Sequence, residues 1–334
     1  MKYLSLSGGG PRVSALCLGT VNFGTAVPRE AAFGQLDYFY EQGGTFLDTA
    51  HVYADWVPGT RAASEKTIGA WIKERRLREK VVISTKGAHP RLDTMSVPRL
   101  GKGEVAQDLE ESLSALGIEC IDLYFLHRDD PSLPAAEILD MLEGFKKAGK
   151  IGHYGCSNWA RERIEEAGGE AARHGYEGFV SNQLLWGIGD INPAGLNDKT
   201  MVAMDAPTFA WHRETQQSVM AYMAGCKGYF SKKRRGLPVP PGDALLYGTP
   251  SNDWLLEKLP ALEARFGCGP MPICLAYIMV QPFPAVPIAS FSSPGQLGEA
   301  LSAADLDFPP ELLAEIRDSR RYCGKEVNPV KYIR

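Results

Sequence analysis

GTFLDTAHVYAD, residues 44–55, begins as an apolar strand and ends in polar and titratable side chains. The run over 44–50 is apolar at Phe46 and Leu47, which is typical of a buried strand. The polar side chains come at its end and in the loop that follows: Asp48, Thr49, His51, Tyr53 and Asp55. Such a pattern is expected where parallel strands deliver chemistry at their carboxyl ends.

Seven further runs along the chain have the same strand-like character. Together with 44–50, the predicted strands cover residues 14–20, 80–86, 120–127, 151–158, 178–186, 218–224 and 285–291. Amphipathic helical segments separate them. One helix after the third strand has a single apolar face, made by Val105, Leu109, Leu113 and Leu116.

Eight repeated strand–helix units predict parallel strands with right-handed crossovers, closed into a (β/α)8 TIM barrel of the α/β class. An open doubly wound sheet would need a glycine-rich phosphate turn after its first strand, and LCLGTVNFG over 16–24 lacks the G-x-G-x-x-G spacing. The first residues indicate two short strands around a Gly-Pro turn, an N-terminal β-hairpin at the barrel floor. We predict a single domain over 1–334.

Composition favours a small-molecule partner. The 334 residues carry a formal net charge of −4, and charges of both signs are spread along the chain, which argues against nucleic acid and anionic membranes as partners. Seven cysteines at scattered positions fit reduced thiols in the cytoplasm better than a disulfide framework. No run approaches the length of a membrane span. Oligomeric state does not follow from these observations.

Four polar groups are predicted to converge on one mouth of the barrel. Asp48 ends the second strand, Tyr53 lies in the loop after it, Lys86 ends the third strand and His127 ends the fourth. A Tyr with a pKa near ~10 is a poor acid, and an adjacent ammonium such as Lys86 lowers that pKa. Asp48 would keep Lys86 charged, and His127 could donate a hydrogen bond to a substrate oxygen.

The remaining residues provide no competing chemistry. The other five histidines have no paired metal-ligand spacing, Cys268 and Cys274 stand isolated, and we predict no metal site. No nucleophile is paired with a base. A proton donor without nucleophile or metal suits hydride transfer from a cofactor.

These motifs resemble those of the aldo-keto reductases, NAD(P)H-dependent barrel oxidoreductases. The resemblance rests on DTAHVY, STK, LH, YGCSNW and SNQ at these spacings and covers nearly the whole chain. It implies a catalytic tetrad of Asp48, Tyr53, Lys86 and His127, acting on an aldehyde or ketone. It also implies residues that bind the cofactor carboxamide and stack on its ring, which are Ser157, Asn158, Gln183 and Tyr222.

Two regions depart from the family pattern, the segment 285–300 at the expected cofactor site and the long segment 187–209. The segment 285–300, where the family binds the adenosine phosphate, contains no Lys or Arg. We take Ser290, Ser292, Ser293 and Gln296 as its cofactor ligands, which argues for only modest discrimination of NADP(H) from NAD(H). KKRR over 232–235 is either a solvated basic face or a clamp on the cofactor phosphates, and Lys227 and Lys232 are its candidate ligands.

The substrate is a small carbonyl compound, and we predict its contacts as Trp56, Arg128 and Trp186. Aromatic surfaces beside charged groups favour a sugar-like carbonyl. Arg128 and Asp129 alternatively pair with each other. The long segment 187–209 is expected to be a lid or pocket wall, and the terminal segment 323–334 could also reach the mouth.

Two alternatives to the reductase stay open. A Schiff-base aldolase would use Lys86 as nucleophile, but such a lysine should be desolvated rather than placed beside Asp48 and a phenol. A redox-sensing module resembling the β subunits of potassium channels would bind the cofactor and turn over slowly.

Overall fold

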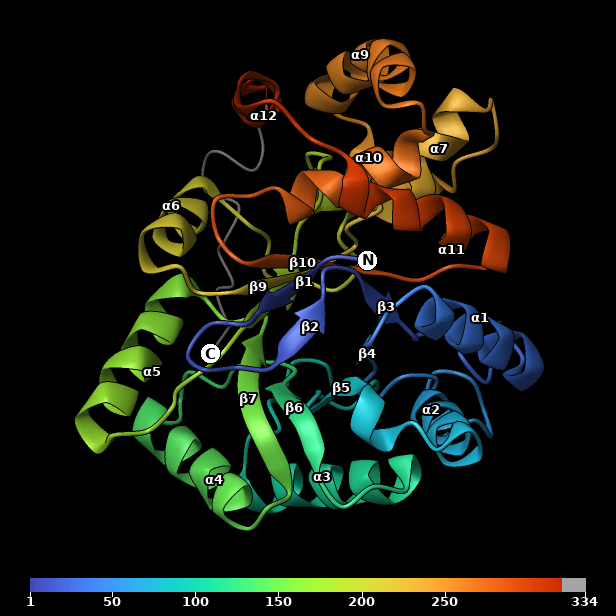
Figure 1. The fold of residues 1–334 in the computed structure, drawn as a ribbon. Coiled ribbons are helices and arrows are strands. Elements are labelled where there is room, and N and C mark those ends of the chain that lie inside the picture. Colours follow the sequence, from blue (N-terminus) through green and yellow to red (C-terminus); the bar gives the residue numbers. More distant parts are fainter. Residues whose placement is uncertain (320–334) are drawn as a thin grey trace.

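The computed structural model describes residues 1–319 and contains a closed barrel of eight parallel strands, in the order β10-β3-β4-β5-β6-β7-β8-β9 (Figure 1). Each strand falls on a predicted run, and only β5 extends beyond it, by one residue. The strands are β3 (Cys17–Gly19), β4 (Phe46–Asp48), β5 (Val82–Gly87), β6 (Ile121–Leu126), β7 (Ile151–Ser157), β8 (Asn182–Leu185), β9 (Val219–Tyr222) and β10 (Ala285–Ala289). The predicted TIM barrel is confirmed.

The N-terminal hairpin is also confirmed. β1 (Tyr3–Ser5) and β2 (Arg12–Ser14) pair antiparallel, and Figure 1 shows them lying across the barrel. Ser7 anchors the turn through its backbone N–H, which donates to Ser218 Oγ over 2.6 Å, and through its own Oγ, which donates to Val180 O over 2.9 Å. Ser218 directly precedes β9, so the hairpin closes the amino-terminal end and leaves the opposite end for the site.

Helices surround the barrel, and their apolar faces pack on the strands (Figure 1). In α3 the predicted stripe is buried against the sheet. The helices are α1 (Arg29–Glu41), α2 (Ala63–Arg75), α3 (Lys102–Leu116), α4 (Ala135–Lys147), α5 (Arg161–His174), α6 (Ala206–Thr215), α7 (Tyr229–Arg234), α8 (Pro241–Tyr247), α9 (Pro250–Phe266), α10 (Pro270–Met279), α11 (Pro294–Leu301) and α12 (Pro310–Asp318). Short 3-10 turns are η1 (Arg78–Lys80), η2 (Pro193–Gly195), η3 (Cys226–Gly228) and η4 (Ser302–Asp305).

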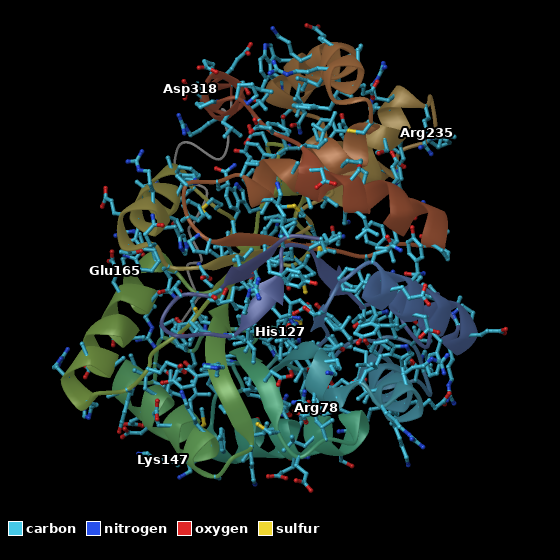
Figure 2. All side chains as sticks on the ribbon, viewed as in Figure 1. Arg78, His127, Lys147, Glu165, Arg235 and Asp318 are labelled. Carbon is cyan, nitrogen blue, oxygen red and sulfur yellow. The ribbon has the colours of Figure 1, made fainter. Side chains whose placement is uncertain are left out.

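Two cores hold the molecule together. The larger lies between strands and helices, and a smaller one fills the barrel interior, where hairpin residues Leu6 and Val13 pack with Phe46 and Phe125. In Figure 2 the labelled His127 lies near the middle of the barrel, whereas Lys147, Glu165, Arg235 and Asp318 lie at the periphery. Within residues 1–319, no helix is both long and apolar enough to span a bilayer.

Candidate active site

A cavity of about 740 Å³ opens at the carboxyl ends of the strands. Tyr53 and His127 line it together with Asp48, and the Lys86 side chain lies behind them, 1% exposed. Residues in or just after the carboxyl-terminal parts of all eight strands line it. The structure therefore brings the four predicted catalytic side chains together at one mouth.

Lys86 is the centre of the polar cluster. Its Nζ donates hydrogen bonds to Asp48 Oδ2 over 2.7 Å, to the carbonyl of Thr49 over 2.6 Å, and to the Tyr53 hydroxyl over 3.2 Å. Three partners match the three donors of an ammonium group, so the lysine is held in one orientation. The Tyr53 oxygen is thereby fixed beside the cavity.

Asp48 is held from its other side. Its Oδ1 accepts from Ser84 Oγ over 2.8 Å and from Gln183 Nε2 over 3.0 Å. Both carboxylate oxygens are therefore occupied, and the charge is fully paired inside the barrel. Gln183 uses its amide N–H₂ on Asp48, which leaves its carbonyl oxygen for a ligand.

The electrostatics of the cluster favour a protonated phenol beside a charged lysine. Burial opposes the charge of Lys86, but Asp48 and Tyr53 outweigh it and raise the pKa of the ammonium above its ordinary value. Burial also raises the pKa of Tyr53, more than Lys86 lowers it. Our expectation of a lowered tyrosine pKa is wrong, because the phenol loses more hydration than the ammonium replaces.

His127 is a neutral imidazole in this site. Burial lowers its pKa well below the ordinary value, and the nearby His89, Arg128 and Lys86 act in the same direction. Its Nδ1 is enclosed and has no hydrogen-bond partner among the described residues. Nε2 is therefore the nitrogen that can reach a molecule in the cavity, where it would carry the proton and donate a hydrogen bond.

The residues expected to hold a carboxamide lie on one wall of the cavity. Asn158 Oδ1 accepts from the Tyr222 hydroxyl and from the Val202 backbone N–H, and Asn158 Nδ2 donates to Ser157 Oγ over 2.9 Å. Ser157, Gln183 and Tyr222 line the same wall. This wall carries amide, hydroxyl and ring surfaces together, as an amide-bearing planar ligand requires.

The loop after β9 is shaped by unusual backbone conformations. Met223, Cys226 and Lys227 all have positive φ, at 58°, 49° and 51°. Left-handed backbone is costly for residues other than glycine, on the order of 1 kcal/mol each, and persists where packing imposes it. The result is a tight loop that turns Lys227 and Gly228 toward the cavity.

Lys227 and most side chains of the basic run KKRR are bonded to acidic side chains or to a carbonyl group. Lys227 Nζ donates to Asp243 over 2.7 Å, and Lys232 donates to the carbonyl of Lys227 over 3.0 Å. Arg234 pairs with Glu263 over 2.8 Å, and Arg235 lies 3.8 Å from Glu299. Of the predicted phosphate ligands Lys227 and Lys232, only Lys227 lines the cavity.

Of the four predicted cofactor ligands after β10, only one lines the cavity. Ser290 lines the cavity and donates from Oγ to the carbonyl of Gly19 over 2.8 Å. Ser293 caps α11 by accepting from the Gln296 N–H, and the Gln296 side chain accepts from the Ser292 N–H over 2.9 Å. These last three organise the start of α11 and lie outside the cavity lining.

The predicted substrate contacts are only partly placed at the mouth. Trp56 lines the cavity and is 48% exposed. Arg128 also lines it, but its charge is paired with Asp198 over 2.6 Å. Arg128 does not pair with Asp129, which pairs with Arg163 over 3.1 Å.

Trp186 is not at the mouth, contrary to our expectation. It is 3% exposed and packs against Phe209, Tyr277 and Phe283. The strand β8 ends at Leu185, so the ring that follows turns outward, toward the helices, rather than toward the barrel axis. The terminal segment 323–334 lies outside the described residues.

The segment after β8 forms a wall of the cavity. Asp198 and Met201 line it, and Val202 donates its N–H to Asn158 over 3.0 Å. Arg128 holds the segment from the other side through Asp198 and Thr200. The length of 187–209 indicated such a wall, but no local signal in the sequence singles out Asp198.

Other wall residues were missed by our reading of the sequence. His89 lies three residues after Lys86, a position at a strand end that could have indicated it. Leu92, Met95 and Met271 also line the cavity, at positions without a periodic signal.

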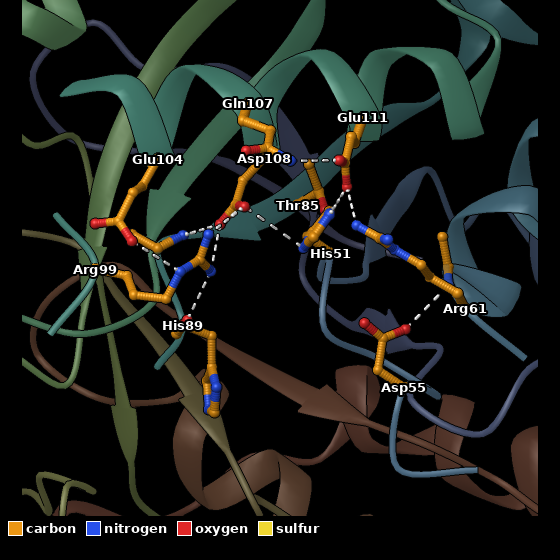
Figure 3. A network of polar contacts seen from close by, with 12 residues as sticks. His51, Asp55, Arg61, Thr85, His89, Arg99, Glu104, Gln107, Asp108 and Glu111 are labelled. Atoms are coloured by element: carbon orange, nitrogen blue, oxygen red, sulfur yellow. Dashed lines mark hydrogen bonds and ion pairs between the residues drawn. The ribbon is translucent and has the colours of Figure 1, made fainter. Parts of the chain in front are cut away.

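A network of charged side chains connects α3 with the loops after β4 and β5 (Figure 3). Asp108 pairs with Arg99 over 2.9 Å, and Glu111 pairs with Arg61 and with His51 Nε2 over 2.5 and 2.8 Å. The backbone N–H of His51 donates to the carbonyl of Lys86 over 2.9 Å. The network thus ties α3 to the loop that carries Tyr53.

A sequence model of the Aldo/keto reductase family matches residues 15–321. The chain belongs to the aldo/keto reductase family. It is an oxidoreductase of that family, whose members typically depend on NAD(P)H and act on small carbonyl substrates. No grouping of His, Cys, Asp or Glu that could hold a metal ion occurs within residues 1–319.

Relatives of this reductase match it over most of its length or over about half of it. The "Uncharacterized oxidoreductase YrpG" of Bacillus subtilis (strain 168) is 29% identical over 95% of each chain. "Norsolorinic acid reductase B" of Dothistroma septosporum is 31% identical, but over 52% of this chain and 46% of that protein. The crystal structure of the thermostable aldo-keto reductase Tm1743 superimposes with a TM-score of 0.70 at 23% identity, covering 96% of this chain and 100% of that one.

The residues present in this reductase fit a nicotinamide cofactor. The cavity lining includes Tyr53, Asn158, Tyr222, Lys227 and Ser290, so it offers amide, ring, ammonium and hydroxyl contacts to such a molecule. Its volume of about 740 Å³ lies within the usual range for small-molecule sites.

Proposed function

We propose that this reductase converts an aldehyde or ketone to the alcohol, with Tyr53 as the general acid and NADPH as the preferred cofactor. The observation that carries the proposal is the hydrogen-bonded series Asp48–Lys86–Tyr53 at the cavity wall. When bound, the cofactor supplies a hydride to the carbonyl carbon. The chain's own residues supply the proton and the orientation.

Tyr53 is suited to donate a proton when an alkoxide develops. Its pKa is raised, so the phenol is protonated at neutral pH, and Lys86 holds it within 3.2 Å of a fixed positive charge. That charge stabilises the tyrosinate left after proton transfer. His127 would donate a second hydrogen bond to the same oxygen and orient the carbonyl.

Ser157, Asn158, Gln183 and Tyr222 are proposed to bind the nicotinamide end of the cofactor. Lys227 and Ser290 are the proposed ligands toward the adenosine phosphate, whereas Lys232, Ser292, Ser293 and Gln296 would act only by holding loops in place. A single partly paired lysine supports a modest preference for NADPH over NADH.

The mouth favours a carbonyl compound with an apolar body. Its lining residues around Tyr53 are largely apolar: Val52, Trp56, Leu92, Met95 and Met201. The expected sugar-like substrate rested on Trp56, Arg128 and Trp186, of which only Trp56 retains free surface at the mouth. The relatives named norsolorinic acid reductases support reduction as the direction. A cytoplasmic location stays a prediction from the sequence.

A Schiff-base aldolase receives no support from this site. Lys86 carries three hydrogen bonds and a raised pKa, whereas an amine nucleophile must be neutral and free.

The test uses purified protein with NADPH deuterated at the transferable position and two aldehydes without an α-hydroxyl group, benzaldehyde and propanal. We expect deuterium on the carbinol carbon of the product and a higher kcat/KM for benzaldehyde. Product without deuterium would overturn the hydride transfer. Catalytic turnover also separates this enzyme from a cofactor-binding sensor that turns over slowly.

A further inference from the structure

His89 is a second imidazole in the cavity, directly beside His127. The two ring centroids are 4.6 Å apart and the planes meet at 67°. His89 lines the same cavity as Tyr53 and Trp56. In the proposed reduction, Tyr53 and His127 both contact the carbonyl oxygen of the substrate. Neither of these roles requires His89.

The backbone at His89 is held in place by hydrogen bonds to the Arg99–Asp108 ion pair. Ala88 has a φ of +62°, a conformation that an alanine rarely adopts, and its N–H donates to Asp108 Oδ2 over 2.8 Å. Arg99 donates to the carbonyl of His89 over 3.0 Å and pairs with Asp108. Figure 3 shows these contacts on the backbone of His89, with its ring pointing away from the network. The Arg99–Asp108 ion pair therefore fixes the backbone from which the ring extends.

The hydrogen bonding of His89 determines which nitrogen carries the proton. Its Nδ1 lies 2.7 Å from the carbonyl of Pro90, and a carbonyl oxygen can only accept, so Nδ1 must carry the hydrogen. Burial and the nearby Arg128 lower the pKa of His89 to about 4, so the ring is neutral at physiological pH. Nε2 then bears a lone pair, and it has no partner among residues 1–319.

The two imidazoles consequently have opposite hydrogen-bonding character. His127 is proposed above to donate from Nε2, whereas His89 presents an acceptor at Nε2. A carbonyl oxygen of the substrate can accept from His127, and a hydroxyl group of the substrate can donate to His89. Other polar side chains nearby are less suited to accept, because Arg128 has only donors and Asp198 is already bonded to Arg128 and Thr200.

We propose that His89 is a specificity-determining residue whose Nε2 accepts a hydrogen bond from a hydroxyl group on the carbon next to the substrate carbonyl. The inference rests on the carbonyl reduction proposed above and adds a preference for α-hydroxy carbonyl compounds over analogues of the same size without the hydroxyl group. The apolar mouth then accommodates the rest of such a molecule.

The experiment compares two substrates that differ by one hydroxyl group, 2-hydroxypropanal and propanal. The measured quantity is the ratio of their kcat/KM values with NADPH, for the wild type and for His89→Phe. Phenylalanine keeps a ring against His127 but removes the acceptor. We expect the ratio to fall about tenfold, the scale of one lost hydrogen bond, while propanal reduction changes less than threefold.

Two variants serve as controls. His89→Gln places an amide oxygen near the position of Nε2 and should restore most of the ratio. Val97→Ala changes an exposed side chain of the same loop, outside the cavity lining, and should leave the ratio unchanged.

An unchanged ratio in His89→Phe, or an equal loss for both substrates, would overturn the proposed role of His89. Neither result would affect the proposed reduction, because propanal turnover by the wild type and its loss in Tyr53→Phe test that separately.

Discussion

Tyr53 shows how burial and charge compete at a single residue. A neighbouring ammonium alone would lower the pKa of the phenol, but the cavity wall removes enough water to raise it. Lys86 thus acts mainly on the product of proton transfer, by stabilising the tyrosinate, rather than on the resting acid. The sequence placed the two residues together but contained no measure of their hydration.

The pH dependence of reduction follows from these residues. Tyr53 must be protonated to donate, and its raised pKa keeps it so to higher pH than an ordinary tyrosine, whose pKa is near ~10. His89 and His127 are already neutral above their lowered pKa values. We expect kcat/KM for reduction to be level from about pH 6 to 9 and to fall above about pH 10. A decline that begins near neutral pH would contradict this assignment.

Among the elements, the strands were predictable and the loops after them were not. Each strand carries a short apolar run, and residues at strand ends, such as Asp48 and Lys86, follow once the strands are placed. Loop residues depend on long-range contacts that no local pattern records. Trp186 follows β8 directly, yet packs outside the barrel, whereas Asp198 reaches the cavity from the middle of an irregular segment.

The segment after β8 provides a test at this scale. Asp198 pairs with the buried guanidinium of Arg128, and the segment also holds Asn158 through the Val202 N–H. Asp198→Ala leaves a buried charge unpaired, so we expect a loss of about 2 to 3 kcal/mol in the free energy of unfolding and weaker NADPH binding. Lys199→Ala, at an exposed neighbouring position, is the control. Urea unfolding and coenzyme titration measure both effects, and a stable variant with unchanged affinity would argue against the wall.

The loop after β9 tests the cofactor preference. Lys227 is the basic residue of this loop that lines the cavity, and Asp243 neutralises part of its charge. We expect NADPH to bind about tenfold more tightly than NADH in the wild type, and Lys227→Met to remove most of that difference without affecting NADH. Lys233→Met is the control outside the cavity lining. Titration by tryptophan fluorescence measures both coenzymes, and equal affinities in the wild type would show that the preference does not exist.

At the scale of the whole molecule, buried neutral histidines couple stability to pH. Burial lowers the pKa of His89 and of His212 to about 4, whereas the unfolded chain titrates near ~6.5. The unfolded state therefore binds more protons below pH 6.5, and stability must fall as the pH drops from there toward 4.

The expected loss at pH 5 is on the order of 1 to 2 kcal/mol for each of these rings. Urea unfolding of the wild type at pH 7 and pH 5 gives the total loss in the free energy of unfolding. In His212→Gln this loss should be smaller by the contribution of one imidazole. His174→Gln, which changes an exposed ring, should not reduce it. A pH dependence that is unaltered in His212→Gln would contradict the assignment of a neutral buried imidazole.

The barrel, the hairpin and the convergence of the four catalytic side chains all lead to one claim, that Tyr53 donates the proton to the carbonyl oxygen. The most direct measurement is kcat/KM for aldehyde reduction by Tyr53→Phe, with NADPH affinity determined on the same preparation. We predict a loss of about 10² to 10⁴ in kcat/KM and an almost unchanged coenzyme affinity. Near-full reduction by a Tyr53→Phe protein that still binds NADPH would contradict the claim.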